Sequence, residues 1–173
     1  MGKLDVLRYN YVISRIILFL AKPLVSLGIG ASWLKKRVKV NGMTVPYRGT
    51  KIEFPKDVGV GILSKIYWYG DRGFEETVGT YMVPAFSVAD VFLDVGSNFG
   101  FYSVVARKCR PSIRSVCFEP VDFLLRDNER FHLTNGYPDA EVHQLAICDK
   151  IGTTKLLVPD QKKLRFLVTS ASL

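Results

Sequence analysis

The chain has 173 residues, of which 48% are hydrophobic, and it carries a formal net charge of +8. This length is that of one globular domain with a real core, and the hydrophobic content excludes an intrinsically disordered chain. The charge is concentrated near the start: residues 1–56 hold 11 Lys or Arg against two acids, a net +9, whereas the remainder holds 13 basic and 14 acidic residues. Such a basic patch suits anionic lipid, nucleic acid or no particular partner.

The cysteines and histidines indicate neither a disulfide framework nor a metal site. Cys109, Cys117 and Cys148 form no C-x-x-C pair, and two of them fall in strand-like runs. They are predicted to be buried, reduced thiols in a reducing compartment. His132 and His143 are far apart in the sequence, so each is interpreted as a surface residue or as one satisfied within the fold.

The first segment of the chain is apolar but interrupted by charge. Residues 4–21 read LDVLRYNYVISRIILFLA, and Pro23 is expected to end or kink a helix there. A helix that spans a bilayer needs about 20 mostly apolar residues. Arg15 and Lys22 interrupt this run, so no transmembrane helix is predicted. The patterns of a signal peptide and of a myristoylation site do not fit either.

What remains is an amphipathic helix followed by the basic cluster LKKR at 34–37. Residues 1–37 are therefore predicted to form a basic amphipathic N-terminal segment. Two roles stay open for it: peripheral contact with an anionic membrane through residues 4–37, or packing against the domain or a partner. The protein is expected in the cytoplasm, at the membrane periphery if the first role holds.

Residues 38–173 are predicted to form the rest of the protein, beginning with a β-rich section. Within 38–70, β-favouring residues alternate with turn signals, one of them at Asn41-Gly42, and this pattern predicts a small hairpin-rich section. From Asp71 onward, the stretch FEETVGTYMVPAF is predicted to be a helix with acidic residues in its first turn.

Beyond residue 90, apolar strands alternate with helices. The expected strands are VFLDV, SVCFE, EVHQLAI and TTKLLVP, at 91–95, 115–119, 141–147 and 153–159. Helices are expected between them, at 99–109 and 121–133. This alternation predicts an α/β fold with a Rossmann-like doubly wound parallel sheet that helices cover on both faces.

The junction VFLDVGSNFGFYS, residues 91–103, places glycines between the first strand and its helix. Ligands of such sheets bind beyond the carboxyl ends of the strands. Gly96 allows a tight turn, Gly100 allows a close approach, and the free N–H groups at the helix start favour a carboxylate or phosphate. Glu119 follows Gly96 by 119 − 96 = 23 residues, near the spacing of about 20 at which an acid takes a ribose hydroxyl. A nucleoside pocket is therefore predicted, with a purely structural turn as the alternative.

The same residues narrow the choice of nucleoside. A dinucleotide fingerprint would require glycine where the chain has Asn98 and Phe101, and no phosphate-binding G-K-S/T loop is present. Asp94 would repel a pyrophosphate, but it suits a sulfonium-bearing amino acid with a free ammonium group. These features select S-adenosylmethionine as the cofactor.

The motif D-V-G-S-N-F-G at 94–100, together with F-E-P at 118–120, resembles the FkbM family of S-adenosylmethionine-dependent methyltransferases. Two further stretches are similar to that family, LAICDKIGTTKLLVP at 145–159 and FEET at 74–77. The resemblance runs from about Val45 to the end of the sequence. It implies a Rossmann-like methyltransferase sheet with the cofactor between the glycine motif and the second strand.

The resemblance also implies roles for the matching residues of a cofactor-binding core at 90–159. The methionine part would be surrounded by Asp94, Gly96, Ser97, Asn98 and Gly100. Glu119 would hold the ribose hydroxyls, and Pro120 would shape the turn after it. Asp149 would lie near the adenine edge with Ala146 or Ile147, unless it is an ordinary acid of a turn.

Family members continue with an apolar strand that carries a D-x-E-G motif, which does not occur in this sequence. The methyltransferase sheet is therefore expected to be incomplete, and no catalytic base is assigned. In doubly wound methyltransferases the first strand lies in mid-sheet. The outer edge of 91–95 is consequently expected to be open, and the chain to be marginally stable and to associate through that edge.

The resemblance implies O-methylation of a hydroxyl on a sugar, glycan or secondary metabolite. The alternative is a truncated, non-catalytic remnant that binds the cofactor weakly or contacts a membrane or partner. A nucleic-acid methyltransferase is not expected, because the basic segment lacks interleaved aromatic residues that stack on bases. The expected partner is a small-molecule or glycan acceptor.

Overall fold

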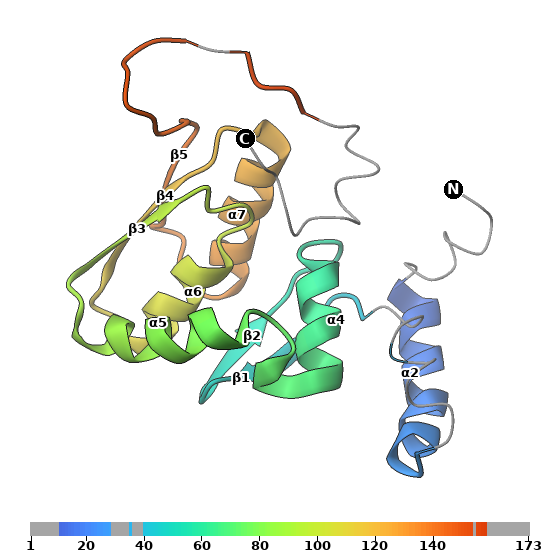
Figure 1. Ribbon diagram of the computed structural model, residues 1–173. Helices are drawn as coiled ribbons and strands as arrows, with labels where there is room; N and C mark the ends of the chain where they lie inside the picture. Colours follow the sequence, from blue (N-terminus) through green and yellow to red (C-terminus); the bar gives the residue numbers. More distant parts are fainter. Residues whose placement is uncertain (1–10, 29–34, 36–39, 154, 159–173) are drawn as a thin grey trace.

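The computed structural model describes residues 11–28, 35, 40–153 and 155–158, and it confirms the expected α/β class (Figure 1). Strands β1 and β2 form an antiparallel hairpin, and a separate parallel sheet has the order β3-β4-β5. This arrangement is compatible with a Rossmann-like fold. The elements are α2 (Tyr11–Ser26), β1 (Thr44–Tyr47), β2 (Thr50–Glu53), α4 (Val60–Tyr69), a 3-10 turn η1 (Gly70–Arg72), α5 (Glu76–Val88), β3 (Val91–Val95), α6 (Phe101–Cys109), β4 (Arg114–Phe118), α7 (Asp122–Thr134) and β5 (Glu141–His143).

Helix α2 continues through Pro23 and ends at Ser26. The expected end of the helix is therefore displaced by less than one turn, because a proline this close to the carboxyl terminus disturbs only the hydrogen bonding to the turn before it. Leu18 and Ala21 on this helix are buried. Among the residues that the structure describes, no helix is long and apolar enough to cross a membrane.

Among the described residues 40–70, one hairpin is present, β1–β2, where a hairpin-rich section was predicted, and the end of that section is helix α4. The hairpin turn lies at Arg48-Gly49, where both residues have positive φ. The expected turn signal at Asn41 serves a different purpose. The Asn41 side chain donates to Asp57 Oδ1 at 2.8 Å and accepts from the Asp57 backbone amide at 2.8 Å, so it joins two loop segments.

Helix α4, Val60–Tyr69, occupies the end of the section predicted to be rich in hairpins. Its sequence VGILSKIYWY is rich in β-favouring residues, but Ile62, Leu63 and Ile66 are buried on one side of the helix. Spacings of three and four residues place these side chains on a common helical face. Burial of that face outweighs the β propensity of the individual residues, because β propensity depends strongly on context.

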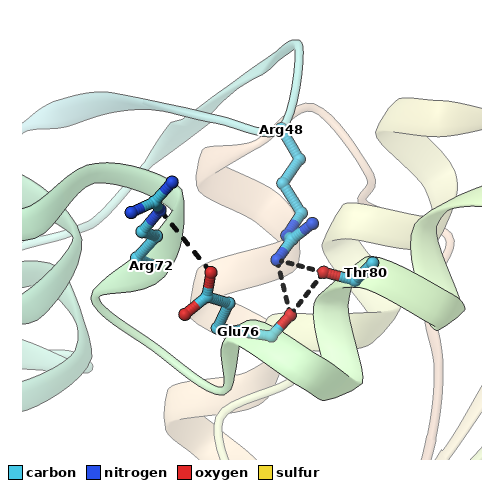
Figure 2. A network of polar contacts seen from close by, with 4 residues as sticks. All are labelled: Arg48, Arg72, Glu76 and Thr80. Atoms are coloured by element: carbon cyan, nitrogen blue, oxygen red, sulfur yellow. Dashed lines mark hydrogen bonds and ion pairs between the residues drawn. The ribbon is translucent and has the colours of Figure 1, made fainter.

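A polar network fastens the hairpin turn to helix α5 (Figure 2). Arg48 donates to the backbone carbonyl of Glu76 at 2.7 Å and to Thr80 Oγ1 at 3.2 Å, and Thr80 Oγ1 donates to the same carbonyl at 2.7 Å. Arg72 forms an exposed ion pair with the Glu76 carboxylate at 3.5 Å. The start of α5 is thereby held against the hairpin. Helix α5 is the element that leads into β3.

The parallel sheet is held in register by direct pairing of apolar residues. Leu93 of β3 lies opposite Val116 of β4, and Cys117 of β4 lies opposite Val142 of β5. Helices α6 and α7 lie together on one side of this sheet and separate it from the hairpin (Figure 1). The connections are those of two consecutive βαβ units, as the alternating sequence pattern predicts.

The core lies between the hairpin and helices α6 and α7, and aromatic rings dominate its centre. Phe54 follows the hairpin, and its ring centroid lies 5.2 Å from that of Phe131 on α7. Phe99 packs edge-on against Phe131 at 5.1 Å, and Phe101 packs edge-on against Tyr47 at 5.1 Å. Phe99 and Phe101 flank Gly100, so the core anchors the glycine-rich turn on both sides.

In the part of the chain that the structure describes, no helix covers the second face of the parallel sheet, whereas helices were expected on both faces. Val91, Leu93 and Val95 alternate along β3 and are exposed, Leu93 by 59%. Strand β3 is also an edge strand, and no other strand of the described chain pairs with its outer side. An apolar face and an open edge therefore coincide on one strand.

The structure also shortens the strands that were expected after α7. The strand predicted at 141–147 ends at His143, and the backbone amide of Leu145 donates to the His143 carbonyl at 2.9 Å, a local turn that interrupts the ladder. The described residues of 153–159 form no strand.

Cys148 is consequently exposed instead of buried in a strand. Cys117 is buried and Cys109 is half-buried, and all three thiols are free.

The coincidence of an apolar face and an open edge on β3 predicts self-association. We expect the purified chain to sediment faster as its concentration rises, and Leu93→Lys to weaken this association, because a lysine on each copy adds repulsion between like charges. Sedimentation velocity over a range of concentrations measures the effect. Leu133→Lys, at an exposed leucine of α7, is the matched control. A parent chain that stays monomeric throughout would contradict the prediction.

Candidate functional site

The glycine-rich turn, residues 96–100, leaves the carboxyl end of β3 and leads into α6. The amides of Gly96 and Ser97 both donate to the carbonyl of Phe118, the last residue of β4, at 2.9 and 3.1 Å. These two bonds continue the pairing of β3 and β4 into the turn. They place the turn beside the carboxyl end of the neighbouring strand, where ligands of parallel sheets bind.

Glu119 fastens the turn from the end of β4. Its Oε2 accepts the backbone amide of Asn98 at 2.9 Å, and its Oε1 accepts that of Val121 at 2.9 Å. The side chain is only 4% exposed, and burial raises the pKa of the carboxyl although the two amide donors oppose this shift. Each carboxylate oxygen has two lone pairs, so one on each oxygen remains for a further donor.

The backbone amides of residues 96–100 donate within the protein, so they are not among the free N–H groups expected at the start of the helix. Besides the amides of Gly96, Ser97 and Asn98, that of Phe99 donates to Asn98 Oδ1 at 2.8 Å and that of Gly100 to the Ser97 carbonyl at 2.8 Å. Asn98 adopts the left-handed conformation, with φ of 53°, which asparagine tolerates better than most residues. The turn is therefore a self-satisfied support and not a cradle for phosphate.

Asp94 lies one strand away from Glu119 and is held by α6. Ser103 Oγ donates to Asp94 Oδ2 at 2.7 Å, and the Cys117 thiol donates to Ser103 Oγ at 3.0 Å. Burial raises the pKa of the Asp94 carboxyl, and the Ser103 hydroxyl partly offsets this effect. Ser103 was not among the predicted site residues. Its signal in the sequence is a polar residue on the buried face of an otherwise apolar helix turn.

Asn128 on α7 is a second residue that sequence reasoning missed. Its Nδ2 donates to Ser97 Oγ at 2.9 Å and to the Asn98 carbonyl at 3.1 Å, so α7 holds the turn from behind. His132, one helical turn later, contacts the carbonyl of Asn128 through Nδ1 at 3.0 Å. Both side chains are buried. The sequence signal that would have identified them is a pair of polar residues four positions apart in a helix whose neighbouring residues Phe123, Leu124 and Phe131 are apolar.

The protonation of His132 gives the fold a dependence on pH. Because a carbonyl accepts from Nδ1, that nitrogen carries the proton, and Nε2 is buried without a hydrogen-bond partner among the described residues. Burial lowers the pKa of His132. The unfolded chain then binds more protons than the folded one below about pH 6.5, so stability falls as the pH is lowered through this window.

We therefore expect His132→Gln to reduce the loss of stability between about pH 7 and about pH 5. The free energy of unfolding in urea at several pH values measures this slope. His143→Gln, at the exposed histidine that ends β5, is the control for the removal of an imidazole as such. The raised pKa values of the Asp94 and Glu119 carboxyls add stability as the pH falls, and this opposite contribution is the same in both variants. An unchanged slope in His132→Gln would show that the imidazole is not the group responsible.

The remaining predicted residues differ in where they lie. Pro120 directly follows Glu119, half-buried, and its carbonyl accepts from Gln144 Nε2 at 3.5 Å. Asp149 is exposed in the segment after β5, and no hydrogen bond described above joins it to the glycine-rich turn. The structure thus brings seven of the eight predicted residues to one edge of the sheet, namely Asp94, Gly96, Ser97, Asn98, Gly100, Glu119 and Pro120.

The negative charge at this edge of the sheet determines which class of ligand would bind favourably there. Half-buried Asp94 near the end of β3 and buried Glu119 just after β4 lie on adjacent parallel strands, and the charge of Asp94 contributes to the raised pKa of Glu119. A ligand that brings positive charge and hydroxyl donors would relieve both the repulsion and the desolvation, whereas a polyphosphate would increase the repulsion. The residues present therefore fit a cationic nucleoside better than a nucleotide.

Fold and site together define an α/β protein whose parallel sheet is compatible with a Rossmann-like fold and carries an acidic, glycine-rich turn at its carboxyl edge. Comparison with protein-family models, with curated proteins and with solved structures finds no match to this chain. The residues of this edge are consequently the basis on which a function is inferred.

Proposed function

We propose that this protein is an S-adenosylmethionine-dependent methyltransferase that acts on a hydroxyl of a small molecule, sugar or glycan. The observation that carries the proposal is a pair of carboxyls, half-buried Asp94 and buried Glu119, at the ends of adjacent parallel strands with the glycine-rich turn between them. The resemblance of D-V-G-S-N-F-G and F-E-P to the FkbM family supports the same activity. The free thiols suit a cytoplasmic enzyme.

When bound, S-adenosylmethionine supplies a methyl group on a positively charged sulfur. In the overall transfer, a bond between the acceptor oxygen and the methyl carbon forms as the bond from carbon to sulfur breaks, and the hydroxyl proton leaves to solvent. Asp94 would attract the ammonium group of the amino-acid part. Glu119 would accept ribose hydroxyls with its remaining lone pairs, and the turn would fix the distance between the two carboxyls. The chain's contribution is thus orientation and charge complementarity.

Binding of the cofactor tests the proposal. We expect calorimetric titration of the purified chain to show heat with S-adenosylmethionine and with S-adenosylhomocysteine, and none with NAD. Asp94→Asn should weaken the affinity by about 10- to 100-fold, because hydrogen bonds to a charged group contribute roughly 1.5–3 kcal/mol. Asp90→Asn is the matched control, since Asp90 lies just before β3 and pairs with Arg110 on the surface.

Release of S-adenosylhomocysteine in the presence of hydroxyl-bearing acceptors then tests the transfer itself.

Asn98→Gly should have a milder effect on cofactor affinity than Asp94→Asn, because glycine also adopts the left-handed conformation of the turn. Absence of heat with both adenosyl compounds would overturn the proposal and favour the non-catalytic alternative. Binding without transfer to any acceptor would place the protein among cofactor-binding remnants.

A further inference from the structure

Helix α2 exposes an apolar stripe that nothing in the cofactor site uses. The stripe consists of Ile16, Phe19, Leu20, Leu24 and Leu27, and each of these side chains is exposed, Phe19 by 81% and Leu27 by 72%. Four of them lie on the helix, and Leu27 follows its last residue with its amide donating to the Pro23 carbonyl at 3.1 Å. Five large apolar side chains in water along one helix are unusual for a surface.

The spacing of the stripe shows that it is one continuous surface. Its members follow one another at intervals of three, one, four and three residues, and at 100° per residue these positions fall within an arc of about 140°. Leu18 and Ala21 fall on the opposite side, and both are buried. Leu18 belongs to the main buried cluster of the protein. Packing against the domain therefore buries one face of α2, and the stripe on the opposite face stays exposed.

The helix is held in this orientation by a contact with the body of the protein. Arg15 donates to the carbonyl of Gly42 at 3.4 Å, and α2 lies at the end of the molecule away from the parallel sheet (Figure 1). The stripe is consequently remote from the glycine-rich turn. Its occupant can bind without covering the candidate cofactor site.

The net positive charge of the N-terminal segment, which contains the stripe, indicates what kind of surface the stripe binds. Residues 1–56 carry 11 basic and two acidic residues, a net +9, and the cluster LKKR at 34–37 follows the helix closely in the sequence. A second copy of the chain would bring the same positive segment against this one, which like charges disfavour. An apolar helix stripe in a segment whose sequence is rich in basic residues is the pattern of helices that lie in the headgroup region of anionic bilayers.

We propose that the stripe of α2 docks this protein on an anionic lipid surface, with Phe19 and Leu20 in the acyl boundary and the basic N-terminal segment at the headgroups. The helix lies in the plane of the interface and does not cross the bilayer. The acceptor of the proposed methyl transfer would then be met at the membrane, but docking rests on α2 alone and stands apart from the cofactor site.

Vesicle flotation of the full chain tests the proposal. Vesicles of phosphatidylcholine with about one-third phosphatidylserine should bind the chain, whereas pure phosphatidylcholine vesicles should bind it at least about tenfold more weakly. Raising the salt from about 0.05 to about 0.5 M should weaken the binding to anionic vesicles, because the charge attraction is screened. Equal binding to both kinds of vesicle, or binding indifferent to salt, would overturn the electrostatic part of the proposal.

Substitutions separate the stripe from charge alone. Phe19→Ser should lower binding to anionic vesicles by about tenfold or more, because a large side chain leaves the bilayer boundary. Tyr81→Ser is the matched control, since Tyr81 is a comparably exposed aromatic residue on α5, and it should bind as the parent does. Equal binding by Phe19→Ser and the parent would overturn the stripe as the docking surface. So would a dimer that forms without lipid and is lost in Phe19→Ser.

A spectroscopic variant gives a readout that does not depend on the loss of binding. Phe19→Trp should add an emission component that shifts to shorter wavelength when anionic vesicles are added, relative to the parent with its two tryptophans. The shift reports transfer of the ring from water to the acyl boundary. Added emission that stays unshifted on vesicles carrying bound protein would overturn the proposed orientation of α2.

Discussion

Gly100→Ala is expected to lower the free energy of unfolding by about 2–5 kcal/mol, because left-handed strain of roughly 1–2 kcal/mol is joined by overpacking of roughly 1–3 kcal/mol. Gly100 has φ of 77°, and an alanine Cβ would lie 2.6 Å from Asn128 Oδ1 and 2.7 Å from His132 Cε1. Neither neighbour can withdraw easily. Asn128 is hydrogen-bonded to the turn, and His132 is held by the carbonyl of Asn128.

Gly96→Ala is the matched control for this prediction. Gly96 also has positive φ, 74°, but a Cβ there meets no atom within 4 Å. It should therefore lose only the strain, roughly 1–2 kcal/mol. Urea unfolding of both variants measures the difference. Equal losses would show that α7 moves aside from Gly100, and that the contact between α7 and the turn is looser than the structure indicates.

Glu119→Ala should also have a large effect, about 2–6 kcal/mol of stability, because two part-buried amides lose their acceptor and each unsatisfied donor costs roughly 1–3 kcal/mol. The donors are the amides of Asn98 and Val121. Asn98 belongs to the turn, so the loss of stability should be accompanied by a loss of affinity for S-adenosylhomocysteine. Urea unfolding and calorimetric titration measure the two effects separately.

Two further variants distinguish the roles of the Glu119 side chain. Glu119→Gln retains one acceptor oxygen but turns an amide nitrogen toward a backbone N–H, so its stability should fall between those of the parent and Glu119→Ala. Glu129→Ala, at an exposed glutamate of α7, should leave both stability and affinity unchanged. Unchanged affinity in a folded Glu119→Ala protein would remove Glu119 from the cofactor site and leave it as a support of the turn.

The elements that the sequence predicted well are those encoded by short-range patterns. The run VFLDV is β3 over the predicted residues 91–95, and the second strand differs from its prediction by one residue at each end. A continuous apolar run between turn-forming residues is a local signal of a strand, although the burial that such a run suggests is not found on the exposed face of β3. Helix α6 begins at Phe101 and not at residue 99, because Gly100 takes the left-handed conformation of the turn just before the helix.

The sequence was misleading where local propensity and burial disagree. Helix α4 consists largely of β-favouring residues, and only its packing against the hairpin and the core made a helix of them. Strand β5 is short because its ladder stops at His143, although the apolar pattern continues to Ile147. A strand forms only where a partner offers hydrogen bonds, and the presence of that partner is not a property of the strand's own sequence.

The chemical identity of the candidate site was determined by the sequence, since Asp94, Asn98 and Glu119 lie at strand ends that a βαβ pattern brings to one edge. Their environment was decided by the tertiary structure. Glu119 turned out to hold the amides of the turn, and Asn128 to hold it from a helix 30 residues away in the sequence. Residue type and spacing specify which groups can meet, because backbone geometry acts over a few residues. Burial, pKa and hydrogen-bond partners depend on distant segments, because these properties arise only when the chain has packed.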